Sequence, residues 1–155
     1  MSSSPIIAKR CTNLKARQFA RALTRLFDTE LAKSGLKATQ FSLLAKIYNG
    51  GPVSPSNLAL RMELDKSSLT RNLRPLQEAG LVIQDVGSDA RNRLISLTQA
   101  GRDKYTEANL HWNAAEKTIG ELLGTERINA IHTLVDESLD LIHAAAILRP
   151  NFIDN

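Results

Sequence analysis

Residues 66–79 carry the side chains whose chemistry is easiest to interpret. On a helix that turns about 100° per residue, one face collects small hydroxyls and arginines, namely Ser67, Thr70, Arg71 and Arg74. The opposite face collects Leu69, Leu73 and Leu76. Guanidinium groups bind phosphate or guanine in a forked geometry, and small hydroxyls let the helix backbone approach a ligand closely. The pattern predicts a helix that packs through its leucines and presents its polar face to DNA. The alternative is a solvated amphipathic helix at the surface.

The polar residues of this segment suit different contacts. Arg71 is the candidate for the O6 and N7 atoms of guanine. Lys66 and Arg74 fit phosphates, whereas three small hydroxyls fit either bases or phosphates: Ser67, Ser68 and Thr70. Pro75 removes the hydrogen bond to the carbonyl of Arg71 and is expected to bend the helix beyond its base-reading turns.

An arginine-bearing hairpin is predicted to follow this helix. Two β-rich runs, 81–86 and 92–97, flank a turn that contains Asp89 and Arg91. The carboxylate of Asp89 is close enough in sequence to orient Arg91, which would enter a minor groove, while Arg93 would meet a flanking phosphate. The alternative is a surface salt bridge worth about 0–1 kcal/mol. A polar-faced helix followed at once by such a hairpin is typical of a winged helix-turn-helix.

We call this winged helix-turn-helix the reader. Helix-breaking residues and N-cap residues predict the elements on either side of it. The pattern predicts helices at 6–34, at about 39–48 with Thr39 as cap, at about 55–62 with Ser54 as cap, and at 66–79 with Asp65 as cap. Two further helices follow, one at about 99–123 with Thr98 as cap and one that ends at about Leu148 with Thr125 as cap. At the start of the third helix, Ser54, Ser56 and Asn57 suit either phosphate contacts or ordinary capping.

The expected fold is mainly α with a small β-wing. We expect a tail and dimerisation helix at 1–34, a winged helix-turn-helix at 35–98 and dimerisation helices at 99–155, all in one intertwined domain. Apolar residues recur at helical spacing in the last helix and need a covering partner: Ile128, Ile131, Leu134, Val135, Leu139 and Ile142. A second copy of the chain is the economical partner.

Composition restricts the class of protein. The chain has 155 residues, of which 43% are hydrophobic, and a formal net charge of +4, which suits a folded protein with a polyanionic partner. No apolar run approaches the roughly 20 residues that span a membrane, and the N-terminus does not read as a signal peptide. We therefore expect a soluble, cytoplasmic protein. Its single cysteine excludes an intrachain disulfide, and its histidines have no metal-ligand spacing, so no metal or other cofactor is expected.

Several motifs resemble those of the MarR family of transcriptional regulators. The wing is similar to the family pattern D-x-R followed by L-T-x-x-G, here Asp89, Arg91, Leu97, Thr98 and Gly101. The stretch SSLTRNLRPLQEAGLV resembles the recognition segment of the family, and GLKATQFSLLAKI resembles its second-helix entry. The resemblance covers roughly residues 13–147. It implies a homodimer that binds a pseudo-palindromic operator in double-stranded DNA, usually as a repressor.

The resemblance also implies release from DNA by a small aromatic or phenolic anion, or by oxidation. Candidate effector-binding residues in a cleft beside the reader are Arg17, Arg21, Phe41, Leu44, His111 and Trp112. The apolar members among them equally suit a plain core. Cys11 is a redox candidate because Lys9 and Arg10 precede it and basic neighbours favour the reactive thiolate. The alternative for Cys11 is an inert packing residue.

Two other classes of protein are less compatible with the sequence. An enzyme is not expected, because the chain lacks a nucleophile triad, a glycine-rich phosphate loop and a metal set. A winged helix that binds only proteins would have an acidic or apolar recognition face, whereas this face carries Arg71 and Arg74, and the wing carries Arg91 and Arg93.

Overall fold

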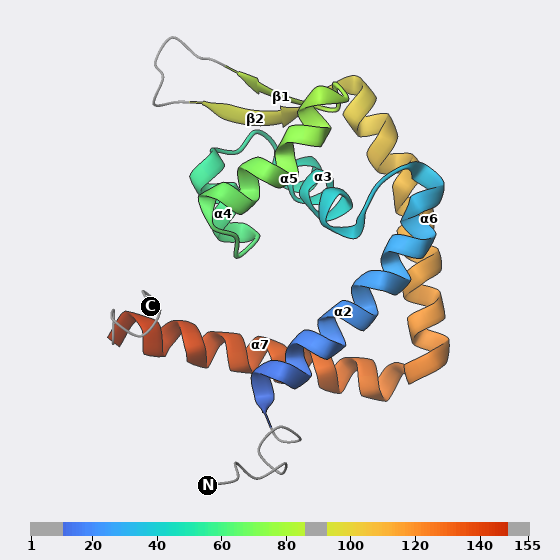
Figure 1. The fold of residues 1–155 in the computed structure, drawn as a ribbon, viewed down its shortest axis with the longest axis vertical. Helices are drawn as coiled ribbons and strands as arrows, with labels where there is room; N and C mark the ends of the chain where they lie inside the picture. Colours follow the sequence, from blue (N-terminus) through green and yellow to red (C-terminus); the bar gives the residue numbers. More distant parts are fainter. Residues whose placement is uncertain (1–10, 86–92, 149–155) are drawn as a thin grey trace, which may run out of the picture. The chain divides into compact units, whose positions relative to one another are not determined.

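The computed structural model describes residues 11–85 and 93–148 as helices joined to one small sheet (Figure 1). In chain order the elements are α2 (Thr12–Leu31), the short 3-10 helix η1 (Ala32–Ser34), α3 (Ala38–Gly50), α4 (Pro55–Arg61), α5 (Lys66–Glu78), β1 (Val82–Asp85), β2 (Leu94–Leu97), α6 (Gln99–Leu123) and α7 (Thr125–Leu148). This order confirms the predicted mainly α architecture with a two-stranded wing.

The chain divides into two compact units, Met1–Ala115 and Glu116–Asn155. Helix α3 lies in the core of the first unit, where it packs against α2, α4, α5 and β2. Its buried side chains meet those of the neighbouring elements in one apolar cluster, which includes Leu43, Leu44, Ile47, Leu58, Leu69, Leu76, Val82 and Ile95. The leucine face predicted for residues 66–79 is therefore the face that α5 buries.

Two predicted N-caps, Ser54 and Asp65, are confirmed by their hydrogen bonds. Ser54 Oγ accepts from the backbone N–H of Asn57 at 3.3 Å and caps α4. Asp65 Oδ1 accepts from the backbone N–H of Ser68 at 2.8 Å and caps α5. Each bond satisfies a backbone donor that has no partner inside its helix.

Two helix starts differ from the sequence prediction. Helix α3 begins at Ala38, before Thr39, because Asp28 of α2 accepts from the Ala38 N–H at 2.7 Å and supplies the cap from a distant part of the chain. Thr125 is the first residue of α7 and does not precede it. Pro75 lies inside α5, as predicted, and the helix continues to Glu78. The predicted start near Ile6 and the wing residues Asp89 and Arg91 fall outside the described residues.

The wing is an antiparallel pair in which Val82 lies opposite Leu97 and Gln84 lies opposite Ile95. Val53, just before α4, makes a further antiparallel bridge to Ile95. Because side chains alternate along a strand, Val82, Gln84 and Ile95 share the inner face. Ile83 lies on the outer, exposed face.

The base of the wing is fixed to the start of α6 by a tight contact. Thr98 Oγ1 donates to the carbonyl of Gly80 at 2.7 Å and accepts from the N–H of Gly101 at 3.0 Å, while the Thr98 N–H donates to Leu81 O at 3.1 Å. A Cβ atom on Gly101 would lie 2.0 Å from that same Leu81 oxygen. Glycine is thus the residue that fits at this position.

In the second unit, α7 exposes large apolar side chains, among them Leu134, Val135, Leu141, Ile142 and Ile147. Among the helices of the described residues, none is both long and apolar enough to cross a membrane.

Candidate nucleic-acid interface

Helix α5 presents a polar face to solvent and rests on buried leucines. Leu69, Leu73 and Leu76 are buried, whereas the predicted DNA contacts on the same helix are exposed or, for Ser68, half-buried: Lys66, Ser67, Ser68, Thr70, Arg71 and Arg74. The leucines set the rotation of the helix, and so they decide which side chains can reach a ligand.

The first turn of α5 is organised around the carboxylate of Asp65. Ser68 Oγ donates to Oδ2 at 2.6 Å, and Ser67 Oγ donates to Oδ1 at 2.7 Å. The hydrogen bonds from the Ser68 side chain, the Ser67 side chain and the Ser68 backbone hold the pKa of Asp65 well below its usual range. Because both hydroxyl protons point at Asp65, the outward-facing lone pairs of Ser67 and Ser68 are acceptors. Such acceptors suit the amino groups of adenine or cytosine without rearrangement.

The two arginines of this face differ in their surroundings. Arg74 Nε donates to Glu78 Oε1 at 2.7 Å, which raises the pKa of Arg74 and draws its guanidinium toward the end of the helix. Among the described residues, the side chain of Arg71 makes no ion pair or hydrogen bond. Arg71 is therefore the guanidinium that is available to a base edge.

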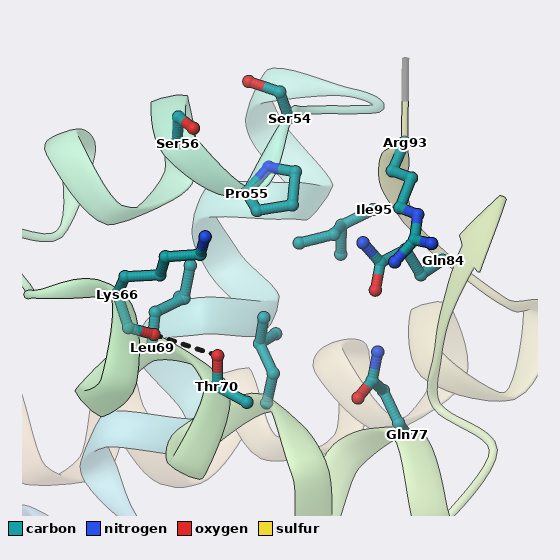
Figure 2. Close-up of a pocket in the computed structure, with 11 residues that line it drawn as sticks. Ser54, Pro55, Ser56, Lys66, Leu69, Thr70, Gln77, Gln84, Arg93 and Ile95 are labelled. Atoms are coloured by element: carbon teal, nitrogen blue, oxygen red, sulfur yellow. Dashed lines mark hydrogen bonds between the residues drawn. The ribbon is translucent and has the colours of Figure 1, made fainter. Parts of the chain in front are cut away.

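A cavity of about 490 Å³ lies between α5 and the inner face of the wing (Figure 2). Lys66, Thr70 and Gln77 line it from α5, and Gln84 and Arg93 line it from the wing. Ser54, Pro55 and Ser56 complete the rim, and the floor is apolar, formed by Leu69, Leu73 and Ile95.

The structure thus separates the predicted contact residues into two groups. It brings five of them to one cavity: Ser54, Ser56, Lys66, Thr70 and Arg93. Of the other predicted contacts that the structure describes, none lines it: Asn57, Ser67, Arg71 and Arg74 are exposed elsewhere on α4 and α5, and Ser68 is half-buried. Sequence reasoning missed Gln77 and Gln84. The available signal was the spacing of Gln77 from Lys66 and Thr70, by eleven and seven residues, which keeps all three on one side of a helix.

The predicted effector residues are only partly brought together. Phe41 and Trp112 stack with ring centroids 4.7 Å apart and line a smaller cavity of about 240 Å³. Leu44 is fully buried in the core and does not line this cavity. The exposed Arg17 and Arg21 and the half-buried His111 do not line this cavity.

The sequence prediction also missed the other residues of this small cavity. Tyr105 stacks on Phe41 at 5.6 Å, and Lys46 is the cation at the rim. Tyr48 extends the aromatic stack through Tyr105 at 4.3 Å. These side chains come from α3 and α6, which are far apart in sequence.

Cys11 occupies the N-cap position of α2. Its Sγ atom accepts from the backbone N–H of Leu14 at 3.5 Å, and the residue is exposed. Within residues 11–85 and 93–148, His, Cys, Asp and Glu side chains form no group that could hold a metal ion.

Comparison with known proteins places this fold in a family. A family model described as the MarR family matches residues 34–92. The chain is similar to the transcriptional regulator MosR of M. tuberculosis in complex with DNA, with 31% identity, a TM-score of 0.73 and coverage of 86% of this chain and 98% of MosR. A mutant of MarR from E. coli complexed with operator DNA shares the fold, with a TM-score of 0.77 at 21% identity over 88% of this chain and 99% of that one.

Curated relatives are named in the same terms. The uncharacterised HTH-type transcriptional regulator YwoH of Bacillus subtilis (strain 168) is 29% identical over 93 residues, which are 60% of this chain and 68% of YwoH. Matches of this kind span between 48% and 68% of the relative's length. The matched wing and helices, together with the motif glycine whose fit is explained above, lead to one assignment: the chain belongs to the MarR family.

Proposed function

We propose that the protein is a sequence-specific DNA-binding transcriptional regulator that acts as a repressor. The observation that carries the proposal is the exposed polar face of α5, with Arg71 unpaired among the described residues and the leucines buried behind it. A helix of this kind fits a major groove, where a guanidinium distinguishes guanine from other bases. The MosR structure, from a relative 31% identical, contains DNA and supports the proposal.

The proposed contacts divide into those that read bases and those that bind phosphates. Arg71 reads guanine, and Ser67 accepts from a base amino group. Arg91 at the tip of the wing enters the adjacent minor groove with Asp89 orienting it, as the sequence predicts. Phosphate contacts fall to the cations Lys66, Arg74 and Arg93, and to Ser54, Ser56 and Asn57 near α4. Ser68, whose hydroxyl proton is donated to Asp65, suits a base amino group as Ser67 does.

The proposal includes a homodimer. Val135 and Ile142 lie seven residues apart on one side of α7 and are 47% and 54% exposed, an uncovered apolar surface that water does not favour. A second copy would cover it and would bring two recognition helices to successive major grooves, about 34 Å apart on a pseudo-palindromic operator. In this arrangement 1–34 and 99–155 form the dimerisation module and 35–98 forms the reader.

Sedimentation measurements test the dimer. Ile142→Lys, on the apolar face of α7, is expected to shift the protein toward monomer, because it would bury an unpaired charge. Asp140→Lys, on the polar side of the same helix, is the matched control and should leave the dimer intact. A wild-type protein that sediments as a monomer at all concentrations would refute this part of the proposal.

Release from DNA is assigned to a small aromatic or phenolic anion in the cavity beside Phe41 and Trp112. Lys46 offers the counter-charge, and Tyr105 offers a stacking surface. Trp112 is the only tryptophan, so its fluorescence should respond to titration with aromatic acids, and Lys46→Gln should weaken that response. For oxidation, peroxide should weaken DNA binding by the wild type and not by Cys11→Ser.

Footprinting on DNA that flanks the protein's own gene tests the main proposal. With excess random competitor, the wild type should protect a palindromic stretch and Arg91→Ala should protect it less while remaining a dimer. Loss of the dimer in Arg91→Ala would show that the arginine is structural. No protected site on that DNA or in a pool of random sequences would refute sequence-specific binding.

A further inference from the structure

The cavity beside α5 separates two rows of side chains on that helix. Lys66, Thr70 and Gln77 lie along one side, and all three line the cavity. Ser67, Arg71 and Arg74 lie roughly 90° further round and do not line it. The first row faces the inner side of the wing, and the second row faces solvent.

The opposite wall of the cavity is set by strand alternation. Gln84 pairs with Ile95 on the inner face of the sheet, and Arg93 precedes Ile95 by two residues, so its side chain projects to that same face. The nearest carboxylate of the strand pair, Asp85, follows Gln84 directly and therefore belongs to the outer face.

The charge of this cavity is uncompensated. Its described lining contains two cations, Lys66 and Arg93, and no aspartate or glutamate. In Figure 2 these cations lie on opposite sides of the cavity, and the amides of Gln77 and Gln84 lie on the side of Arg93. An apolar floor below offers no competing acceptor. Such a cavity suits an anion that presents several oxygen acceptors at once.

The two rows correspond to the geometry of B-DNA. If α5 enters a major groove and the wing enters the neighbouring minor groove, the backbone of one strand must cross the gap between them, since that backbone separates the two grooves. The cavity occupies this gap. We propose that it is a preformed slot for one backbone phosphate of the crossing strand, bound by Lys66 and Arg93 and by the amides of Gln77 and Gln84. This inference rests on the proposed DNA-binding function.

The slot gives each lining residue a defined task. Lys66 and Arg93 neutralise the phosphate, and each glutamine amide donates to one of its oxygens. Thr70 Oγ1 donates to the carbonyl of Lys66 at 2.9 Å, so Thr70 shapes the wall and does not read a base. Holding one phosphate at a fixed place also fixes the depth and angle of α5, which determines where Arg71 meets the base edges.

Phosphate neutralisation tests the slot directly. A duplex recovered from a random pool by the wild-type protein is prepared with each phosphate replaced in turn by an uncharged methylphosphonate, and binding is followed by fluorescence anisotropy. At one position in each half-site the wild type should lose about tenfold or more in affinity, the scale of a charge-assisted hydrogen bond. Lys66→Met, Arg93→Met and Gln77→Met should lose less than about twofold further at that position, because the interaction is already absent. At every other phosphate, these variants should show the same loss of affinity as the wild type.

Matched controls and contrary outcomes separate this inference from the broader proposal. Gln18→Met and Arg102→Met change exposed residues outside the cavity and should retain the full wild-type profile. The slot would be refuted if the loss from each slot substitution added to the loss from the methylphosphonate at every position. It would also be refuted if the slot variants lost their preference for the selected duplex but kept their affinity for random DNA. If inorganic phosphate stabilises the wild type but not Lys66→Met while the methylphosphonate profiles stay additive, the cavity holds a free anion and the DNA assignment is wrong. Failure of the wild type to select any duplex would refute the proposed function itself.

Discussion

Replacing Gly101 by alanine is expected to damage the joint between wing and helix. A Cβ atom at this position would lie 2.0 Å from the carbonyl oxygen of Leu81 and 2.9 Å from its carbonyl carbon. The obstacle is backbone, so no side-chain rotation can relieve the contact. To relieve the contact, the first turn of α6 must move away from Gly80 and Leu81, which follow α5. Thr98 opposes that movement through its hydroxyl bond to Gly80 and its backbone bond to Leu81.

The size of the effect follows from those two contributions. Overpacking a well-packed site costs about 1–3 kcal/mol, and stretching a hydrogen bond at the joint loses part of the ~0.5–1.5 kcal/mol that such a bond contributes. We expect Gly101→Ala to lower the free energy of unfolding by about 2–4 kcal/mol. For a protein of this size that corresponds to a fall in Tm of about 5–15 °C.

Thermal unfolding followed by circular dichroism at fixed protein concentration measures the change. Gly120→Ala is the matched control, because Gly120 lies in the same helix and an added Cβ there meets no atom within 4 Å. Alanine has the higher helix propensity, so this control should be neutral or stabilising by up to about 1 kcal/mol. If Gly101→Ala unfolds within about 2 °C of the wild type, a range that corresponds to less than ~1 kcal/mol, the joint is not as tight as the geometry indicates and this explanation of the motif glycine is wrong.

Three further outcomes concern α5. Arg71→Ala should weaken binding to a selected duplex by about 1–3 kcal/mol and relax base preference; equal weakening on selected and random duplexes in anisotropy titrations would make Arg71 a phosphate contact. Asp65 stabilises the folded state above the ordinary aspartate range and loses that effect as pH falls through its lowered folded-state pKa. Thermal melts at a series of acidic pH values should therefore show a weaker acid dependence for Asp65→Asn, and an unchanged profile would refute the capping role. Leu69→Ala should cost about 2–5 kcal/mol in chemical denaturation, because Leu69 is 2% exposed beneath the polar face; a cost below about 1 kcal/mol would contradict that packing.

Local signals account for what the sequence predicted well. Ser54 and Asp65 are caps whose hydroxyl or carboxylate acts on an N–H three residues ahead, so a short window of sequence contains the whole interaction. The leucine face of α5 is also local, because helical periodicity alone places Leu69, Leu73 and Leu76 together. These features require no tertiary contact, so a short stretch of sequence is enough to predict them.

The remaining features depend on partners that are distant in sequence. Asp28 caps α3 from another helix and moves its start ahead of Thr39, the local candidate. Gln84 becomes a wall of the cavity only because β1 pairs with β2 and faces α5. Likewise, Tyr105 reaches Phe41 only when α6 packs beside α3. In each case the role of the residue cannot be predicted from its type, because it depends on a contact that forms only in the folded protein.

The internal bonds of α5 also indicate how specificity is divided along the helix. Breaking the exposed Arg74–Glu78 pair costs little, since such pairs contribute about 0–1 kcal/mol, so Arg74 can exchange Glu78 for a phosphate. Asp65 cannot give up its bonds as cheaply, because the start of the helix depends on them. Ser67 and Ser68 therefore remain acceptors while the cap is intact, and they would be repelled by a phosphate oxygen. In the complex that we propose, discrimination between bases then falls on Arg71 as donor and Ser67 as acceptor, and the slot residues fix their register on the DNA.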